Sequence, residues 1–208
     1  MKGVNMRVVV DGQPLSNPPA AETLQALLDQ VREGLGQGRI IVAVTVNARP
    51  LVGDALSMAL AEAPQGEITL ETANAPEVVA SAFRDVANQL NVAGSAQADL
   101  AARLNADGVA SVAPELGAFC GIWANCQKTL NDAGALLQRD FGAFEYDGET
   151  LTTRLASLSE KLRELRDAFD HRDFMLAADL LQFEMPEQCA TWSQMMGEIA
   201  ADVEKVSA

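Results

Sequence analysis

Apolar residues follow one period before residue 75 and another after it. Up to that point they alternate with polar residues in short runs, as in a strand with one buried face. From Pro76 onward they recur every three or four residues, as in a helix that buries one side. The change predicts a small α/β domain over residues 1–75 and a helical bundle domain over residues 76–208. The expected fold class is α+β.

Three strands and one or two helices are expected in the first domain. The strand-like runs are residues 7–10, 40–46 and 67–72, which alternate or are rich in β-branched residues. The sequence Ser16-Asn17-Pro18 suits the start of a helix after the first run, and residues 53–63 suit a second, shorter helix. We therefore expect a three-stranded sheet, with the first two strands parallel if they pair directly.

Four helical segments of comparable length are expected in the second domain. Apolar residues recur at steps of three and four in residues 79–104, 116–141, 151–169 and 174–203, and the connections are short. This pattern is typical of an antiparallel four-helix bundle. Gly94 marks a weak point of the first helix. Pro186 should kink or break the last helix near Met185, because proline has no N–H to donate.

Residues 173–185, with the sequence DFMLAADLLQFEM, are apolar on two sides of a helix. One face includes Leu181 and Met185, and Leu176, Leu180 and Phe183 form a stripe on roughly the opposite side. A helix that is apolar on two sides needs cover on two sides. We expect the N-terminal domain or a second subunit to cover the stripe, so its three residues are candidate partner-binding residues.

Asp179 lies inside this two-sided segment, so its carboxylate is expected to be partly buried. A buried carboxylate needs a partner or a raised pKa. Arg154, Arg163 and Arg166 of the preceding helix are candidate partners for an ion pair that fixes packing. The alternative is a functional, catalytic carboxylate at Asp179.

The charge and the apolar runs restrict the class of partner. The net charge of −14 is the wrong sign for binding a nucleic-acid backbone or an anionic membrane. The longest apolar run, residues 40–46, is far shorter than the ~20 residues of a membrane span, and no signal peptide is expected. Three cysteines without metal or disulfide spacing suit a reducing cytoplasm.

Few residues suit catalysis or metal binding. The single histidine, His171, follows a helix end, where a cap or surface role is expected. The weaker alternative is a divalent-metal site formed by Asp167, Asp170, His171 and Asp173, although the spacing of a calcium loop is absent. No glycine-rich phosphate loop is recognisable, so no cofactor is expected.

Two further clusters suggest packing or contact surfaces. Phe141, Phe144 and Tyr146 either plug the end of the bundle or, if exposed, form an aromatic contact site, in which Phe144 and Tyr146 would bind a partner. Ala113, Gly117 and Gly121 recur every four residues and form a smooth helix face that a neighbouring helix can approach closely.

These observations favour a non-enzymatic cytoplasmic interaction protein that acts through helical surfaces. It would be an adaptor, a regulator or an export-chaperone-like binder of another protein, and a homodimer. The alternatives are a carboxylate-based or divalent-metal-dependent enzyme, and a structural subunit of a larger assembly.

Overall fold

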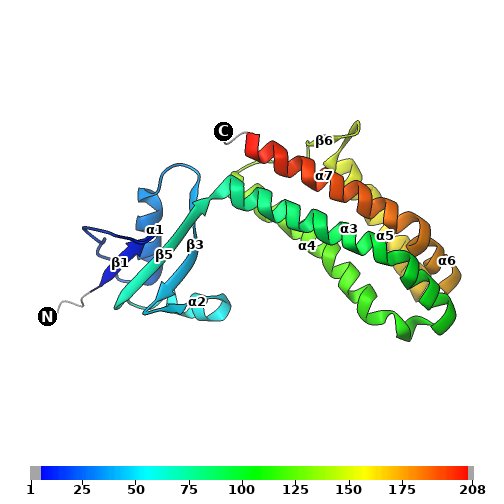
Figure 1. Ribbon diagram of the computed structural model, residues 1–208, viewed down its shortest axis with the longest axis horizontal. Coiled ribbons are helices and arrows are strands. Elements are labelled where there is room, and N and C mark those ends of the chain that lie inside the picture. Colours follow the sequence, from blue (N-terminus) through cyan, green and yellow to red (C-terminus); the bar gives the residue numbers. More distant parts are fainter. Residues whose placement is uncertain (1–5, 206–208) are drawn as a thin grey trace. The chain divides into compact units, whose positions relative to one another are not determined.

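The computed structural model describes residues 6–205 and has an α+β fold (Figure 1). The chain divides into two compact units, Met1–Val78 and Val79–Ala208. The first unit contains a mixed sheet and two helices, and the second is mostly helical. Each unit has its own apolar core.

The sheet of the first unit has five strands rather than the predicted three. In the order of the sheet they are β2 (Gln13–Pro14), β1 (Arg7–Val10), β5 (Glu67–Asn74), β3 (Arg39–Val46) and β4 (Arg49–Pro50). The two added strands have two residues each, and both arise where left-handed residues reverse the chain: Asp11 and Gly12 before β2, Asn47 and Ala48 before β4.

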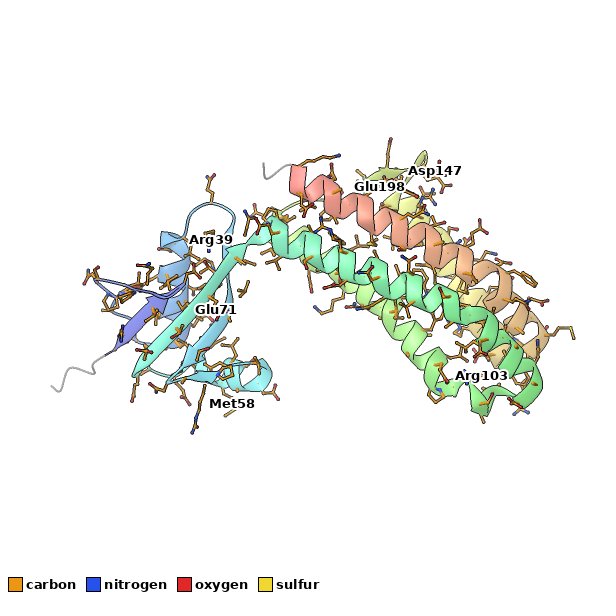
Figure 2. The ribbon with its side chains drawn as sticks, viewed as in Figure 1. Arg39, Met58, Glu71, Arg103, Asp147 and Glu198 are labelled. Carbon is orange, nitrogen blue, oxygen red and sulfur yellow. The ribbon has the colours of Figure 1, made fainter. Side chains whose placement is uncertain are left out.

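The first two predicted strands do not pair with each other. β5 lies between them, parallel to β1 and antiparallel to β3. The helix α1 (Leu24–Gly34), capped by the Thr23 hydroxyl, contributes Leu27 to a core that also contains Ile68 and Leu70 of β5. On the other side of β5, Glu67 and Glu71 are exposed, as the alternation predicts. Arg39 and Glu71 of the sheet, and Met58 of the short helix α2 (Gly53–Ala59), are labelled in Figure 2.

The second unit contains long helices that share one core. The helices are α3 (Ala75–Asp107), α4 (Ala113–Leu137), α5 (Leu151–Asp170), α6 (Phe174–Asp179) and α7 (Met185–Lys205), with the hairpin strands β6 (Glu145–Tyr146) and β7 (Glu149–Thr150) before α5. Figure 1 shows α3, α4, α5 and α7 running side by side. Trp123 of α4 packs edge to face on Trp192 of α7, with the ring centroids 5.9 Å apart.

Helix α3 continues through Gly94, where the sequence predicted a weak point. A Cβ atom at Gly94 would lie 2.9 Å from Cβ of Cys189 in α7, so the glycine allows these two helices to pack closely. One turn of α7 further on, the Ser193 hydroxyl donates a hydrogen bond of 2.8 Å to the Ala87 carbonyl of α3.

The sequence predicted a kink or a break of the last helix near Met185. The helix does not break there. Residues 180–184 form a π-helical segment, η2 (Leu180–Glu184), and the chain stays helical from Phe174 to Lys205. In this segment the Met185 N–H donates to the Leu180 carbonyl, five residues back. Pro186 has no N–H, and its ring crowds the carbonyl four residues earlier. The wider π turn accommodates the proline without breaking the helix.

Candidate functional site

An apolar groove of about 690 Å³ lies between α4 and α5. Its floor includes Trp123 and Trp192, which are both buried, and the indole N–H of Trp123 has no hydrogen-bond partner within residues 6–205. The α4 wall contains Leu116, Gly117, Cys120, Ala124 and Gln127, and the α5 wall contains Leu155, Ala156, Ser159, Leu162 and Phe169. The groove is open to solvent, and Gly117 and Ala124 on α4 and Ala156 and Ser159 on α5 are small exposed residues of its two walls.

Gly117 leaves the α4 wall of the groove without a side chain at its position, and Gly121 lies outside the lining. A Cβ atom at Gly117 or at Gly121 would have no atom of the described chain within 4 Å, apart from its own helix. The smooth face predicted from Ala113, Gly117 and Gly121 is therefore not used for close packing inside residues 6–205. Each glycine in a helix interior costs ~1 kcal/mol relative to alanine. Gly117 and Gly121 therefore lower the stability of α4 with no packing gain from the part of the chain that the structure describes.

A second hollow of about 270 Å³ continues the groove at Leu155, a residue that lines both. It is bounded by Leu130 and Gly134 of α4, by Phe141, and by Leu151 at the start of α5. The space between α4 and α5 thus extends from Phe169 at one end toward the β6–β7 hairpin at the other. An elongated occupant fits this space better than a compact one.

The α4 side of the groove carries little charge. Three of the 25 residues of α4 are charged, against eight of the 20 residues of α5. Two of the three, Lys128 and Asp132, pair with each other, and Glu115 accepts a hydrogen bond of 2.9 Å from Arg103 of α3. This bond is the first cause of a lowered pKa at Glu115. Arg103 is labelled in Figure 2.

Two of the three predicted partner-binding residues of the last helix are on the surface, and the third is not. Leu176 is 38% exposed and Phe183 is 64% exposed, whereas Leu180 is 2% exposed. The prediction of one continuous stripe assumed a regular α-helix. In the π segment, Leu180 and Leu181 are both buried in the helical core, so Leu180 is covered by its own unit.

Asp179 is exposed, so the prediction of a buried acid at this position was wrong. The Asp179 side chain lies away from the core. The buried residues of this turn are Ala177, Ala178 and Leu180. Two of the three predicted arginine partners pair with other acids: Arg154 forms an ion pair with Glu149, and Arg166 pairs with Asp167.

The aromatic cluster lies against the core in the manner of a plug. Phe141 is buried and packs edge to face on Phe83, at 5.5 Å between ring centroids. Phe144 and Tyr146 are partly buried against the same core. The Tyr146 hydroxyl donates to Oε1 of Gln194, and the Arg154 guanidinium lies 5.2 Å from the centroid of its ring.

The four residues of the predicted metal site, Asp167, Asp170, His171 and Asp173, make separate contacts and do not converge on one point. His171 caps α5, with Nδ1 2.8 Å from the Asp167 carbonyl, and Asp173 caps α6 by accepting a hydrogen bond from the Leu176 N–H. Arg166 forms ion pairs with Asp167 and Asp170. Over residues 6–205, no three His, Cys, Asp or Glu side chains gather in a way that could hold a metal ion.

The cysteines differ in access to solvent. Burial raises the pKa of the Cys126 and Cys189 thiols to about 12, which keeps them protonated and unreactive at neutral pH. Cys120 is exposed on the α4 wall of the groove. It therefore reports on anything that covers this wall.

The spacing of Ala113, Gly117 and Gly121 predicted the smooth face of α4 but not the groove beside it. Trp123 and Trp192 were expected in the core, and they are buried, yet they also form the floor of the groove. The low charge of α4 in an acidic chain is the signal that points to this face.

Comparisons with protein-family models, with curated proteins and with solved structures give no match to this chain. Within residues 6–205, no helix has the length and apolar content needed to cross a membrane.

Proposed function

We propose that this chain is a non-enzymatic interaction protein, and that its helical unit binds the apolar side of a helix from another protein chain in the groove between α4 and α5. In this proposal the unit is a four-helix bundle-like scaffold of an adaptor, regulator or chaperone-like protein. The observation that carries the proposal is the open apolar groove with a tryptophan floor. Helices commonly bind in such grooves through apolar residues on one face.

The dimensions of the groove support a helix as the occupant. Its α4 wall runs from Leu116 to Gln127, which at 1.5 Å per residue is about 17 Å, or three helical turns. The hollow beyond Leu155 adds length in the same direction. Gly117 in the α4 wall leaves room for the backbone of a second helix to approach closely.

The polar groups along the groove support binding rather than catalysis. Its thiol and hydroxyl side chains are Cys120, Cys126 and Ser159, and burial raises the pKa of the Cys126 thiol to about 12. The charged residues of the lining are Arg166 and Asp170, which pair with each other at 3.8 Å. A catalytic thiol or hydroxyl needs an adjacent base within hydrogen-bond reach. The Ser159 hydroxyl instead donates to the Leu155 carbonyl of its own helix.

Photo-cross-linking in the cells of origin tests the proposal. A photo-reactive phenylalanine analogue at Gln127, which lines the groove and is exposed, should yield a discrete protein adduct after irradiation. The same analogue at Asn88, exposed on α3, is the matched control and should not yield that adduct. The proposal fails if position 127 gives no discrete protein adduct, or the same adduct as position 88.

A further inference from the structure

We propose that the exposed side of α6, η2 and α7 is a second docking surface, and that it binds a basic amphipathic helix of another protein. Four exposed residues form this surface, which we call the acidic ridge: Met175, Asp179, Phe183 and Glu187. None of the four lines the groove between α4 and α5. The inference therefore goes beyond the proposed function, because it concerns a separate surface and a partner of different chemistry.

The π segment brings the four residues of the acidic ridge into one line. They follow each other at steps of four, and in a regular α-helix such steps would drift by about 120° around the axis between Met175 and Glu187. The π turn adds one residue, because its hydrogen bond reaches five residues back instead of four. The drift is then only about 20°. Apolar and acidic side chains thus alternate along one side of the helix.

The apolar members of the acidic ridge are mostly in water. Met175 is 76% exposed and Phe183 is 64% exposed. Among the described residues of the helical unit, five large apolar side chains are exposed, and three of them, including Leu176, lie within residues 175–183. A single exposed apolar residue is normal, whereas a cluster is typical of a surface that contacts another molecule.

The acids of the ridge favour a basic partner. Residues 173–204 contain seven acidic residues and no basic one. Three of these acids form ion pairs with bases of other segments: Glu184 with Lys161, Asp202 with Arg139 and Glu204 with Arg84. Asp179 and Glu187 are exposed and have no ion pair within residues 6–205. Their charges are therefore available to a partner.

The surroundings of the ridge are acidic as well. A hollow of about 420 Å³ borders the exposed apolar cluster at Leu176, and its lining has four acids, Glu160, Glu164, Asp167 and Asp173, against Arg163 and His171. Complementary charge determines which partner binds. On a partner helix, residues four apart are separated by about 6 Å along the axis, which is the spacing of the ridge residues. A helix with lysine and leucine at this spacing matches the ridge in charge and in apolar contacts.

A synthetic, helix-forming peptide of leucine and lysine is the probe, and fluorescence anisotropy measures its binding to the full chain at physiological salt, where long-range attraction is screened. We expect saturable binding to the wild type. Phe183→Ser should raise the dissociation constant at least tenfold, and so should Asp179→Asn combined with Glu187→Gln. All three side chains are exposed, so the helical circular dichroism should not change.

Two matched controls make the same changes away from the ridge. Val92→Ser removes an apolar side chain that is 73% exposed on α3. Glu145→Gln combined with Asp147→Asn removes two exposed charges from the β6–β7 hairpin, where Figure 2 labels Asp147. Both controls should bind the peptide as the wild type does.

A third variant separates the ridge from the groove. Ala124→Trp fills the groove and should leave peptide binding unchanged, because the ridge lies elsewhere. The inference is overturned if the wild type does not bind the peptide, if either ridge variant binds it as tightly as its matched control, or if Ala124→Trp releases it. A peptide with glutamate in place of lysine should not bind, and equal binding of this peptide would also overturn the inference.

Discussion

Replacing Leu180 by alanine should destabilise the helical unit far more than replacing Leu176. The two leucines are four residues apart and lay on one predicted stripe, but Leu180 is 2% exposed and Leu176 is 38% exposed. Truncation of a fully buried leucine removes its transfer free energy and leaves a cavity, which together cost about 3 kcal/mol. Leu176 is partly in water already, so its truncation should cost about 1 kcal/mol.

Urea unfolding followed by tryptophan fluorescence measures both values. Trp123 and Trp192 lie in the helical unit, so the signal reports on that unit alone. With a slope of roughly 2 kcal/mol per molar urea, the midpoint should fall by about 1.5 M for Leu180→Ala and by about 0.5 M for Leu176→Ala. Equal shifts, or a larger shift for Leu176→Ala, would refute the burial of Leu180 by the π segment.

Three other results are expected. Gly94→Ala should lower the free energy of unfolding by about 1–3 kcal/mol, because the new Cβ would lie 2.9 Å from Cβ of Cys189 in α7. Gly117→Ala should raise the free energy of unfolding by about 0.5–1 kcal/mol, because its Cβ has open space in the groove and alanine favours a helix. Urea unfolding of the two variants measures both changes. Hydrogen bonds from Thr72, followed by the charge of Arg39, hold the pKa of Asp11 below 3.8, so its stabilising effect is present above pH 3.8 and is lost as the pH falls through the lower folded value. Carboxyl NMR titration should show this lowered pKa, and its return toward 3.8 in Thr72→Val. The Cys126 thiol should stay unlabelled by a disulfide reagent at pH 8 until the protein is unfolded, and labelling of the native protein would contradict its raised pKa.

Strand periodicity predicted three of the five strands of the sheet, and the reason for the difference is local. β1, β3 and β5 bury alternate residues such as Val8, Val44 and Ile68, and this alternation is visible in the sequence. β2 and β4 have two residues each, too few to show a period, and their pairing depends on the left-handed turns that precede them.

The proline in the last helix is compatible with two structures, and packing determines which one forms. Pro186 lacks an N–H group, so the helix must either break before it or widen into a π turn. The contact between Gly94 of α3 and Cys189 of α7 lies just beyond the proline and holds the helix in place there. Leu180, the first residue of the π segment, is buried beside Leu181, whereas the predicted stripe placed these two leucines on different sides of the helix.

The groove was beyond sequence reasoning for a related reason. A repeat of three and four residues indicates which side of a helix faces its neighbours, but not how closely two neighbouring helices approach. Trp123 fits the core pattern and is buried, while the small residues Gly117 and Ala124 beside it leave the space above it open. That combination becomes visible only when α4 and α5 are placed side by side.

Native mass spectrometry of the tagged chain purified from its own cells tests the groove most directly. The measurement compares the wild type with Ala124→Trp, in which an indole fills the groove from its exposed α4 wall. We expect the wild type to carry a second protein chain. The variant, with unchanged helical circular dichroism, should give only the mass of the tagged chain by itself. The same assembly in both proteins, or a bare chain in both, would contradict a protein-binding role for the groove.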